Sequence, residues 1–298
     1  MVQTTSPVFP QYARDLRELV DAALDRYAQP DEGCPDRLGQ AIRYSLLAPG
    51  KRLRPLLVLM AAQACGCPVE AAIPASCAVE MVHAYSLIHD DLPAMDDDDM
   101  RRGQPSCHAA FDQATAILAG DALLARAFEV LATDIRPPEV AARCCAELAR
   151  AAGSTALVGG QADDLAPERV RVDIEHLESI HARKTGAMFL VSLRLGGLVA
   201  AAGDEQLTAL DTYGKTLGLA FQIIDDLLDY QGDEAVLGKR TGKDADRGKL
   251  TFPGLLGIQQ SHHRAGQLIG EACQALTPFG SDTSGLEVLA HYVLQRNH

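Results

Sequence analysis

The sequence predicts an all-α protein, a bundle of about ten helices around a central cavity. Apolar residues recur at helical spacing along most of the chain, Ala and Leu are abundant, and runs of β-branched residues are scarce. Neither a confident strand nor a repeat of solenoid period is evident. We therefore expect one domain over residues 1–298, with residues 1–10 as a loose tail.

The predicted helices follow one another between Pro, Gly and polar stretches. They span residues 12–27, 38–47, 55–65, 71–88, 112–131, 139–152, 174–183, 187–202, 206–230, 252–275 and 286–295. Gly159 and Gly160 are expected to interrupt helical structure, and residues 184–186 to join two helices. Gly120 destabilises the helix around it, so we expect it to pack closely against a neighbour.

The composition is that of an ordinary globular protein, with 47% hydrophobic and 22% charged residues. A formal net charge of −13 argues against a nucleic-acid partner, because such partners require a basic surface. The cysteines, without a secretory segment before them, predict reduced thiols in a cytoplasmic protein, and no zinc site is expected. No membrane span is expected either, since no run of about 18 apolar residues occurs.

An aspartate cluster lies near the end of the 206–230 helix. Asp225 and Asp229 are four residues apart and Asp226 and Asp229 are three apart, so the three carboxylates share one helix face. Like charges at this spacing repel each other, and a cation is therefore expected beside them. Carboxylates without Cys or His suit a hard ion such as Mg²⁺, although a solvated acidic face explains a single cluster equally well.

A similar cluster comes earlier in the chain, at Asp90, Asp91 and Asp96, and is followed by Arg101. Pro93 disfavours helical structure just before it, so the cluster is expected at the C-terminal end of a helix. That end carries partial negative charge and favours cations. Two clusters, each after an apolar helical run, indicate a shared metal-binding function rather than two coincident acidic surfaces.

Several basic residues are candidates for binding an anion. Lys51 and Arg54 follow a Pro–Gly turn, and an Arg side chain matches phosphate geometry, but a basic helix start on the surface is the alternative. Arg101 and Arg102 either neutralise the acidic run as salt bridges or face a metal-bound diphosphate. Lys184, Lys239 and Lys249 are further cations. Each of them, considered alone, is best explained as a solvated lysine.

The combination of two acidic clusters, several cations and an apolar bundle fits a ligand with a diphosphate head and a hydrocarbon tail. Metal ions and cations already in place would stabilise the charge that develops on a departing diphosphate. The other product would be a carbocation, so the cavity should exclude water. Sequence patterns of serine hydrolases, zinc proteases, P-loop and Rossmann proteins do not occur.

Seven blocks of sequence carry a family resemblance. They are GKRLRP, HAYSLIHDDLPAMDDDDMRRG, AILAGDAL, GGQADDL, KTG, FQIIDDLLD and GKRTGKDADRGKLTFP. In this order they resemble the motifs of the trans-isoprenyl diphosphate synthases, and most closely those of the bacterial farnesyl diphosphate synthases. The resemblance covers residues 38–297 and implies an all-α polyprenyl synthetase domain that forms a homodimer. One small departure is Pro49, where the family often has Gly.

The resemblance also implies a role for each motif residue. Mg²⁺, about three ions per site and with Mn²⁺ as an alternative, would be bound by Asp90, Asp91, Asp96, Asp225, Asp226 and Asp229. The allylic diphosphate would be bound by Arg101, Lys184, Gln222 and Lys239, with Thr185 lining the reaction centre and Phe221 and Lys249 also contacting substrate. Isopentenyl diphosphate would be bound by Lys51, Arg54, His83 and Arg102, although His83 taken alone reads as a core histidine.

The reaction that the resemblance implies begins with ionisation of the allylic diphosphate. The isopentenyl double bond then attacks the cation, and a proton is lost to the departing diphosphate. Tyr85 and Ser86 precede Asp90 by about one helical turn, where the growing chain should run. An aromatic residue at position 85 resembles the family's floor for a farnesyl product. The two extra residues in DDLPAMD are also typical of short-chain bacterial members.

Alternative functions differ in what they require of the sequence. A geranylgeranyl or geranyl diphosphate synthase would differ only in the depth of its cavity. A class I terpene cyclase usually carries an Asn/Ser/Glu motif in place of the second aspartate cluster and needs no site for isopentenyl diphosphate. An inactive partner subunit or an acidic helical scaffold would not need intact aspartates in both clusters.

Overall fold

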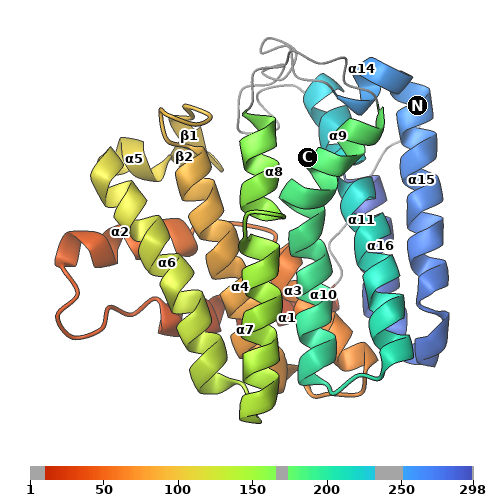
Figure 1. The fold of residues 1–298 in the computed structure, drawn as a ribbon, viewed down its shortest axis with the longest axis horizontal. Helices are drawn as coiled ribbons and strands as arrows, with labels where there is room; N and C mark the ends of the chain where they lie inside the picture. Colours follow the sequence, from red (N-terminus) through yellow and green to blue (C-terminus); the bar gives the residue numbers. More distant parts are fainter. Residues whose placement is uncertain (1–10, 166–173, 232–250, 297–298) are drawn as a thin grey trace.

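The computed structural model describes residues 11–165, 174–231 and 251–296 (Figure 1). Apart from one short hairpin, the regular structure of these residues is helical, which confirms the predicted all-α bundle. Most of the long helices run across the longest axis of the molecule and stand in a row along it (Figure 1). Most of the connections between them are short. Lys239 and Lys249 lie outside the described residues.

The bounds of the elements agree with most of the predicted helices. In chain order they are α1 (Gln11–Tyr27), α2 (Asp36–Leu46), α3 (Leu53–Ala64), α4 (Val69–Asp90), β1 (Met100–Arg101), β2 (Gln104–Pro105), α5 (Cys107–Ala110), α6 (Gln113–Asp134), α7 (Pro138–Ala152), α8 (Leu157–Asp164), α9 (Ile174–His181), the π-helical η1 (Ala182–Gly186), α10 (Ala187–Val199), α11 (Asp204–Gln231), α14 (Phe252–Leu256), α15 (Ile258–Ala275), the 3₁₀ segment η2 (Thr277–Thr283) and α16 (Ser284–Gln295).

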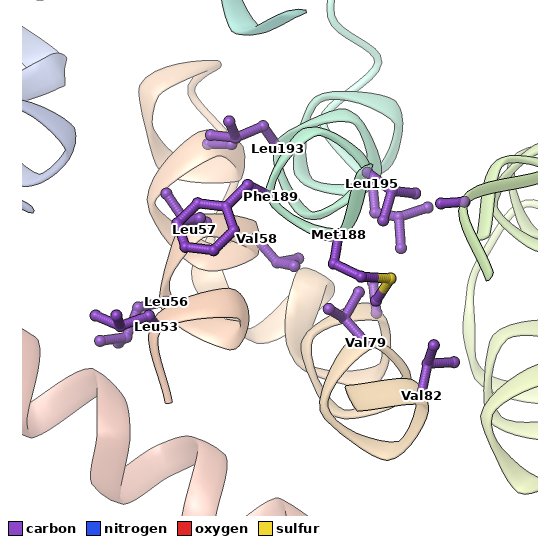
Figure 2. Packing of buried hydrophobic residues seen from close by; sticks show 14 of the residues in the cluster. Leu53, Leu56, Leu57, Val58, Val79, Val82, Met188, Phe189, Leu193 and Leu195 are labelled. Atoms are coloured by element: carbon purple, nitrogen blue, oxygen red, sulfur yellow. The ribbon is translucent and has the colours of Figure 1, made fainter. Parts of the chain in front are cut away.

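Three helices, α3, α4 and α10, form the centre of the core. All three are apolar on nearly every side, as expected of helices that are surrounded by others. Figure 2 shows Leu57 and Val58 from α3, Val79 from α4, and Met188 and Phe189 from α10 meeting in one cluster. The remaining helices bury one face against this centre; α1, for example, buries Val20, Ala23 and Leu24 and exposes its other side, as do most surface helices.

Close packing between α3 and α10 depends on a glycine. A Cβ atom at Gly196 would overlap the carbonyl oxygen of Val58 and lie 2.8 Å from Cβ of Ala61. The two backbones can approach this closely only because residue 196 has no side chain. Gly120 in α6 likewise faces the imidazole of His89, which confirms that it packs closely against a neighbour.

The structure differs from the predicted elements in several places, and α5 and η2 are among the elements that were not predicted. Residues around Gly159 and Gly160 are helical and form α8, so these glycines do not interrupt a helix. The short hairpin of β1 and β2 was not predicted. The helix expected over residues 252–275 is divided at Gly257, whose φ of 78° is incompatible with a continuous helix. The junction at residues 184–186 is a π-helical segment that connects α9 to α10 without a break.

Of the described helices, α4 alone is long and apolar enough to cross a bilayer by these two criteria. Within its apolar window, 72% of the residues are buried inside the protein. A helix at the centre of a folded core has the same composition, so α4 is explained by the packing described above.

The glycine contact predicts a difference between two helix-interior substitutions. Gly196→Ala should lower the free energy of unfolding by about 1–3 kcal/mol, because the new methyl group overlaps the α3 backbone. Gly270→Ala in α15 is the matched control, since a Cβ there meets nothing within 4 Å. It should raise the free energy of unfolding by about 0.5–1 kcal/mol. Urea denaturation followed by circular dichroism measures both, and equal stabilities would contradict the packing argument.

Candidate active site

The two aspartate clusters lie at the same end of the bundle. α4 ends at Asp90, and α11 carries Asp225, Asp226 and Asp229 in its last turns. Both helices run toward the end that also carries the hairpin and α14, drawn at the top of Figure 1. The arrangement confirms that the first cluster stands at a helix C-terminus, where partial negative charge favours cations.

The loop after α4 folds back on the end of the helix. The backbone N–H of Asp96 donates to the carbonyl of Asp90 at 2.8 Å, and that of Asp98 donates to the carbonyl of Asp91 at 3.1 Å. These bonds satisfy carbonyl groups that the helix end leaves without helical partners. They also return Asp96 to the position of Asp90, so the residues inserted between the aspartates form a tight loop and keep the cluster together.

Asp91 is buried and forms a salt bridge with Arg101 on the hairpin. Nε of Arg101 lies 2.7 and 2.9 Å from the two carboxylate oxygens, and Nη2 lies 2.5 Å from Oδ1. Of the two alternatives for Arg101, the structure therefore shows the salt bridge. A carboxylate has about four acceptor sites, so these bonds still leave acceptor capacity on Asp91. Arg102 instead places its guanidinium against Gly50.

Asp90 is in an unusual electrostatic environment. Desolvation raises the pKa of Asp90 to about 6, while Lys184 lowers it and the neighbouring Asp96 and Asp91 raise it. The charge of Lys184 is the largest influence that opposes this rise, so Lys184 lies near Asp90 although it is 94 positions later in the chain. A carboxyl group in such surroundings gains a strong affinity for any cation that replaces its lost hydration.

The π-helical segment η1 carries Lys184 and Thr185 between the two clusters. Nζ of Lys184 donates to Oδ2 of Asp164 on α8 at 2.6 Å. A Cβ at Gly160 would lie 2.5 Å from the backbone nitrogen of Lys184, so α8 packs directly on this segment. π-Helical turns occur frequently at functional sites, where they displace side chains from regular helical positions.

Thr185 links η1 to the second cluster through hydrogen bonds. Its hydroxyl donates to Oε1 of Gln222 at 3.1 Å, and Nε2 of Gln222 donates to Oδ1 of Asp226 at 3.1 Å. The other oxygen of Asp226 accepts from the backbone N–H of Phe252 at 3.0 Å. Asp226 is buried, and both of its carboxylate oxygens accept hydrogen bonds from the protein.

Asp225 faces a different group of side chains. Nη2 of Arg296 lies 3.0 Å from its Oδ1 and donates to the carbonyl of Phe221 at 2.8 Å. The guanidinium carbon of Arg296 lies 3.8 Å from the ring centroid of Phe221, in a cation–π contact. Asp225 also raises the pKa values of Lys51 and Arg54 against the larger lowering by burial, so α11 and the start of α3 face each other.

The residues expected to bind isopentenyl diphosphate form a group of cations. Nη1 of Arg54 lies 3.3 Å from Nε2 of His83, and the guanidinium carbon of Arg54 lies 5.2 Å from the ring centroid of Phe189. Burial lowers the pKa of Arg54 to about 10. Burial and then the charges of Arg54 and Arg102 lower the pKa of His83 well below its usual value. His83 is therefore a neutral hydrogen-bonding group among cations rather than an ordinary core histidine.

A pocket opens beside these cations, between the hairpin, α2 and α4. Its polar lining includes Tyr44, Arg52, Glu80, His83, Arg101 and Arg102. Nε of Arg54 is buried and has no hydrogen-bond partner within the described part of the chain. A buried donor without an acceptor is unusual, and a bound anion would supply the acceptor.

Tyr85 and Ser86 occupy α4 just before the first cluster. The ring of Tyr85 is buried and meets the imidazole of His89 edge to face, with centroids 5.7 Å apart. The pKa of Tyr85 is raised by burial and then by the charge of Asp90. The hydroxyl of Ser86 donates to the carbonyl of His83 at 2.9 Å. Tyr85 is thus beside the first cluster and inside the bundle.

The donor chemistry of both clusters fits Mg²⁺, which prefers carboxylate oxygens and phosphate groups. Asp90 and Asp96 show the crowding of like charge that a bound cation would relieve. Among the described residues, no three Asp, Glu, His or Cys side chains converge on one point. A complete coordination sphere therefore needs oxygen atoms from another source, such as a diphosphate and water.

Some residues at this site were not among the sequence candidates. Arg52, Glu80, Asp164 and Arg296 form ion pairs with or beside the predicted residues. Spacing along the chain does not indicate them, because their partners are between 20 and 71 residues away. Gln161, part of the GGQADDL block, is buried, and its side-chain amide has no hydrogen-bond partner among the described residues.

Comparison with known proteins agrees with this geometry. The polyprenyl synthetase family matches residues 35–277. Farnesyl diphosphate synthase of Escherichia coli is 46% identical over 297 residues, which cover 97% of this chain and 99% of that protein. The chloroplastic geranylgeranyl pyrophosphate synthase 3 of Arabidopsis thaliana is 44% identical over 297 residues, with 97% and 82% covered.

A solved structure gives the same result for the fold. The apo crystal structure of an FPP/GFPP synthase from Zymomonas mobilis superposes with a TM-score of 0.82 and 37% identity, and covers 95% of this chain and 99% of that one. The chain belongs to the polyprenyl synthetase family.

Proposed function

We propose that the protein is a farnesyl diphosphate synthase, which condenses isopentenyl diphosphate first with dimethylallyl diphosphate and then with geranyl diphosphate. The observation that carries the proposal is the placement of η1. Lys184 acts on Asp90 of the first cluster, and Thr185 is hydrogen-bonded through Gln222 to Asp226 of the second. Two acidic helix ends thus border one cationic segment, as a shared diphosphate site requires.

The allylic diphosphate is assigned to the space between the clusters. Lys184 and Arg101 supply positive charge there, and Gln222 supplies an amide. Asp90, Asp91, Asp96 and Asp225 are the carboxylates we assign to metal binding, with Asp226 and Asp229 behind them. Because both oxygens of Asp226 already accept hydrogen bonds, its first role is to hold Gln222 and Phe252 in place.

Proteins of this family generally use Mg²⁺, and we propose about three ions per site with Mn²⁺ as an alternative. When bound, Mg²⁺ stabilises negative charge on phosphate oxygens and so makes diphosphate a better leaving group. The residues of this chain hold the diphosphate and exclude water from the cavity below it. Thr185, which is hydrogen-bonded to Gln222, is proposed to line the reaction centre, and Lys184 to bind the allylic diphosphate.

Isopentenyl diphosphate is assigned to the three cations Lys51, Arg54 and Arg102 together with the neutral His83. An Arg side chain can bind phosphate oxygens through two parallel hydrogen bonds, and Arg54 has a buried Nε available for one. Lys239 and Lys249, which are outside the described residues, are proposed to add charge over the allylic diphosphate.

The farnesyl product is proposed from Tyr85. The buried ring of Tyr85 lies under the first cluster, where it would stop a growing chain. Relatives named for different products are about equally similar to this chain: a farnesyl diphosphate synthase is 46% identical and a geranylgeranyl pyrophosphate synthase is 44% identical. Overall identity therefore does not determine chain length, and cavity depth does.

Two other functions are less well supported. A terpene cyclase would not need the group of Lys51, Arg54 and His83, which the structure brings together. An inactive partner subunit would have no reason to keep Asp90 in an environment that raises its pKa to about 6. We place the protein in the cytoplasm, in keeping with the substrates, which are water-soluble diphosphates.

The chain length of the product is the direct test. With isopentenyl and dimethylallyl diphosphates and Mg²⁺, the purified protein should make mainly farnesyl diphosphate, identified by chromatography after dephosphorylation. Tyr85→Ala should shift the products to geranylgeranyl diphosphate or longer, because the small side chain opens the space beneath Asp90. Tyr85→Phe is the control and should retain the farnesyl product. A mainly geranyl or geranylgeranyl product from the wild type would reject the assignment.

The metal role of Asp225 predicts a loss of turnover without a loss of fold. Asp225→Ala should lower kcat by roughly 10²–10³-fold, the range for loss of one group that stabilises developing charge. Helicity by circular dichroism should be unchanged, because Asp225 is only half-buried. Glu205→Ala, at the exposed start of the same helix, should leave kcat within twofold. Wild-type turnover in the Asp225 variant would contradict the role.

A homodimer is proposed, with the exposed face of α6 as the contact. Ile117 and Leu118 are 44% and 55% exposed there, which is unusual for adjacent large apolar residues. Leu118→Glu should convert dimer to monomer in analytical ultracentrifugation, because it places a charge in the contact. Ile258→Glu, an exposed apolar position on α15, should leave the dimer intact. A monomeric wild type would refute the proposal.

A further inference from the structure

An ion pair lies beneath the residues assigned to isopentenyl diphosphate. Arg52 and Glu80 have side chains that are each only 4% exposed, and Nη1 of Arg52 lies 2.7 Å from Oε1 of Glu80. Arg52 stands directly between Lys51 and Leu53 in the chain, while Glu80 is one helical turn before His83 on α4. The pair therefore joins the two segments that supply the cationic group.

Arg52 holds three parts of the structure at once. In addition to Glu80, its Nε donates to Oδ1 of Asp21 on α1 at 2.8 Å, and its Nη2 donates to the carbonyl of Ala48 at 3.0 Å. Each nitrogen of the guanidinium thus makes a hydrogen bond. A planar group with fixed donor directions can hold its partners in only one arrangement, which a lysine cannot do.

The backbone at Arg52 is constrained as well. Its φ of 52° and ψ of 36° are left-handed, a region that costs a non-glycine residue about 1–3 kcal/mol unless the surroundings determine it. This left-handed residue directly precedes α3. The side chain of Arg52 consequently points into the protein, whereas Lys51 approaches the ring of Tyr292 and Arg54 approaches His83.

The charge of Glu80 also acts on Arg54 and Arg102. Burial lowers the pKa values of Arg54 and Arg102, and the charge of Glu80 is the largest influence that opposes the lowering in both. One buried carboxylate therefore offsets repulsion among three guanidinium groups. Without it, the arginines would be expected to separate or move toward water.

We propose that Arg52 and Glu80 are positioning residues for isopentenyl diphosphate: their buried ion pair fixes the left-handed turn that aims Lys51 and Arg54 at the substrate. The inference rests on the proposed function, because it takes Lys51 and Arg54 as the binding groups. Both residues also line the pocket beside the hairpin, but all three guanidinium nitrogens of Arg52 are already paired, with Glu80, Asp21 and the carbonyl of Ala48, so we assign neither residue a contact with substrate. Both act through the backbone and through the arginines that Glu80 balances.

The test removes both charges together. Breaking a buried pair from one side leaves an unpaired charge and destabilises strongly, whereas replacement of both partners by apolar residues is often tolerated. In Arg52→Met/Glu80→Met we expect the KM for isopentenyl diphosphate to rise roughly ten- to hundredfold, since small misplacements have effects of this size. The KM for the allylic diphosphate and the kcat at saturation should change by less than about threefold.

The control is a second ion pair between core helices. Arg194 on α10 lies 2.7 Å from Asp211 on α11, with side chains 29% and 25% exposed. Arg194→Met/Asp211→Leu removes a partly buried ion pair in which neither residue is assigned to a substrate site. It should leave both KM values unchanged, so a loss of stability alone is separated from a loss of positioning.

Two further variants separate the possible failures. Lys51→Ala tests the proposed function itself, and an unchanged KM for isopentenyl diphosphate there would reject the binding site. If Lys51→Ala raises this KM but the folded double variant does not, the positioning role is rejected and the binding site stands. Should the double variant fail to fold, Arg52→Lys replaces it: a lysine keeps the charge but not the three-way contact, so an unchanged KM would overturn the inference.

Discussion

Burial of charge at one end of an apolar bundle is the constraint on which the rest of this structure depends. α3, α4 and α10 provide a core with almost no polar atoms, and the carboxylates and cations stand at its edge. Each charge there has lost hydration, so each requires a partner of opposite sign. Arg101 forms an ion pair with Asp91, Asp164 with Lys184, and Arg296 with Asp225. These pairings keep a strongly charged site compatible with a stable fold.

The same pairings explain why the site can respond to a ligand. In the pair of Arg296 and Asp225, the Arg296 side chain is 5% exposed and that of Asp225 is 43% exposed, so the carboxylate is the accessible partner. The pair of Arg52 and Glu80 differs, because both side chains are fully enclosed and each guanidinium nitrogen is used. The accessible carboxylate of Asp225 therefore suits binding, while the pair of Arg52 and Glu80, with both side chains only 4% exposed, suits the maintenance of a fixed shape.

Sequence reasoning succeeded where a pattern is local. Apolar periodicity identified α4 and α11, and the short spacing within DDLPAMD and IIDDLLD identified the carboxylates on them. It failed where tertiary contacts decide. Gly159 and Gly160 are poor helix formers, yet both lie in α8. The absence of a side chain at residue 160 lets α8 pack directly on the backbone of Lys184. The β1–β2 hairpin has two residues in each strand, too few for an alternating pattern.

The two acidic clusters, similar in sequence, are not equivalent in the structure. In the first, Asp90 and Asp96 are brought together by a loop that folds back on a helix end. In the second, the residues stay on one regular helix, and adjacent side chains point in different directions. Asp226 turns inward and holds Gln222 and the start of α14, while Asp225 turns toward Arg296 and the start of α3. Adjacent carboxylates of one motif therefore have different partners: Asp226 organises the backbone around the site, and Asp225 pairs with Arg296.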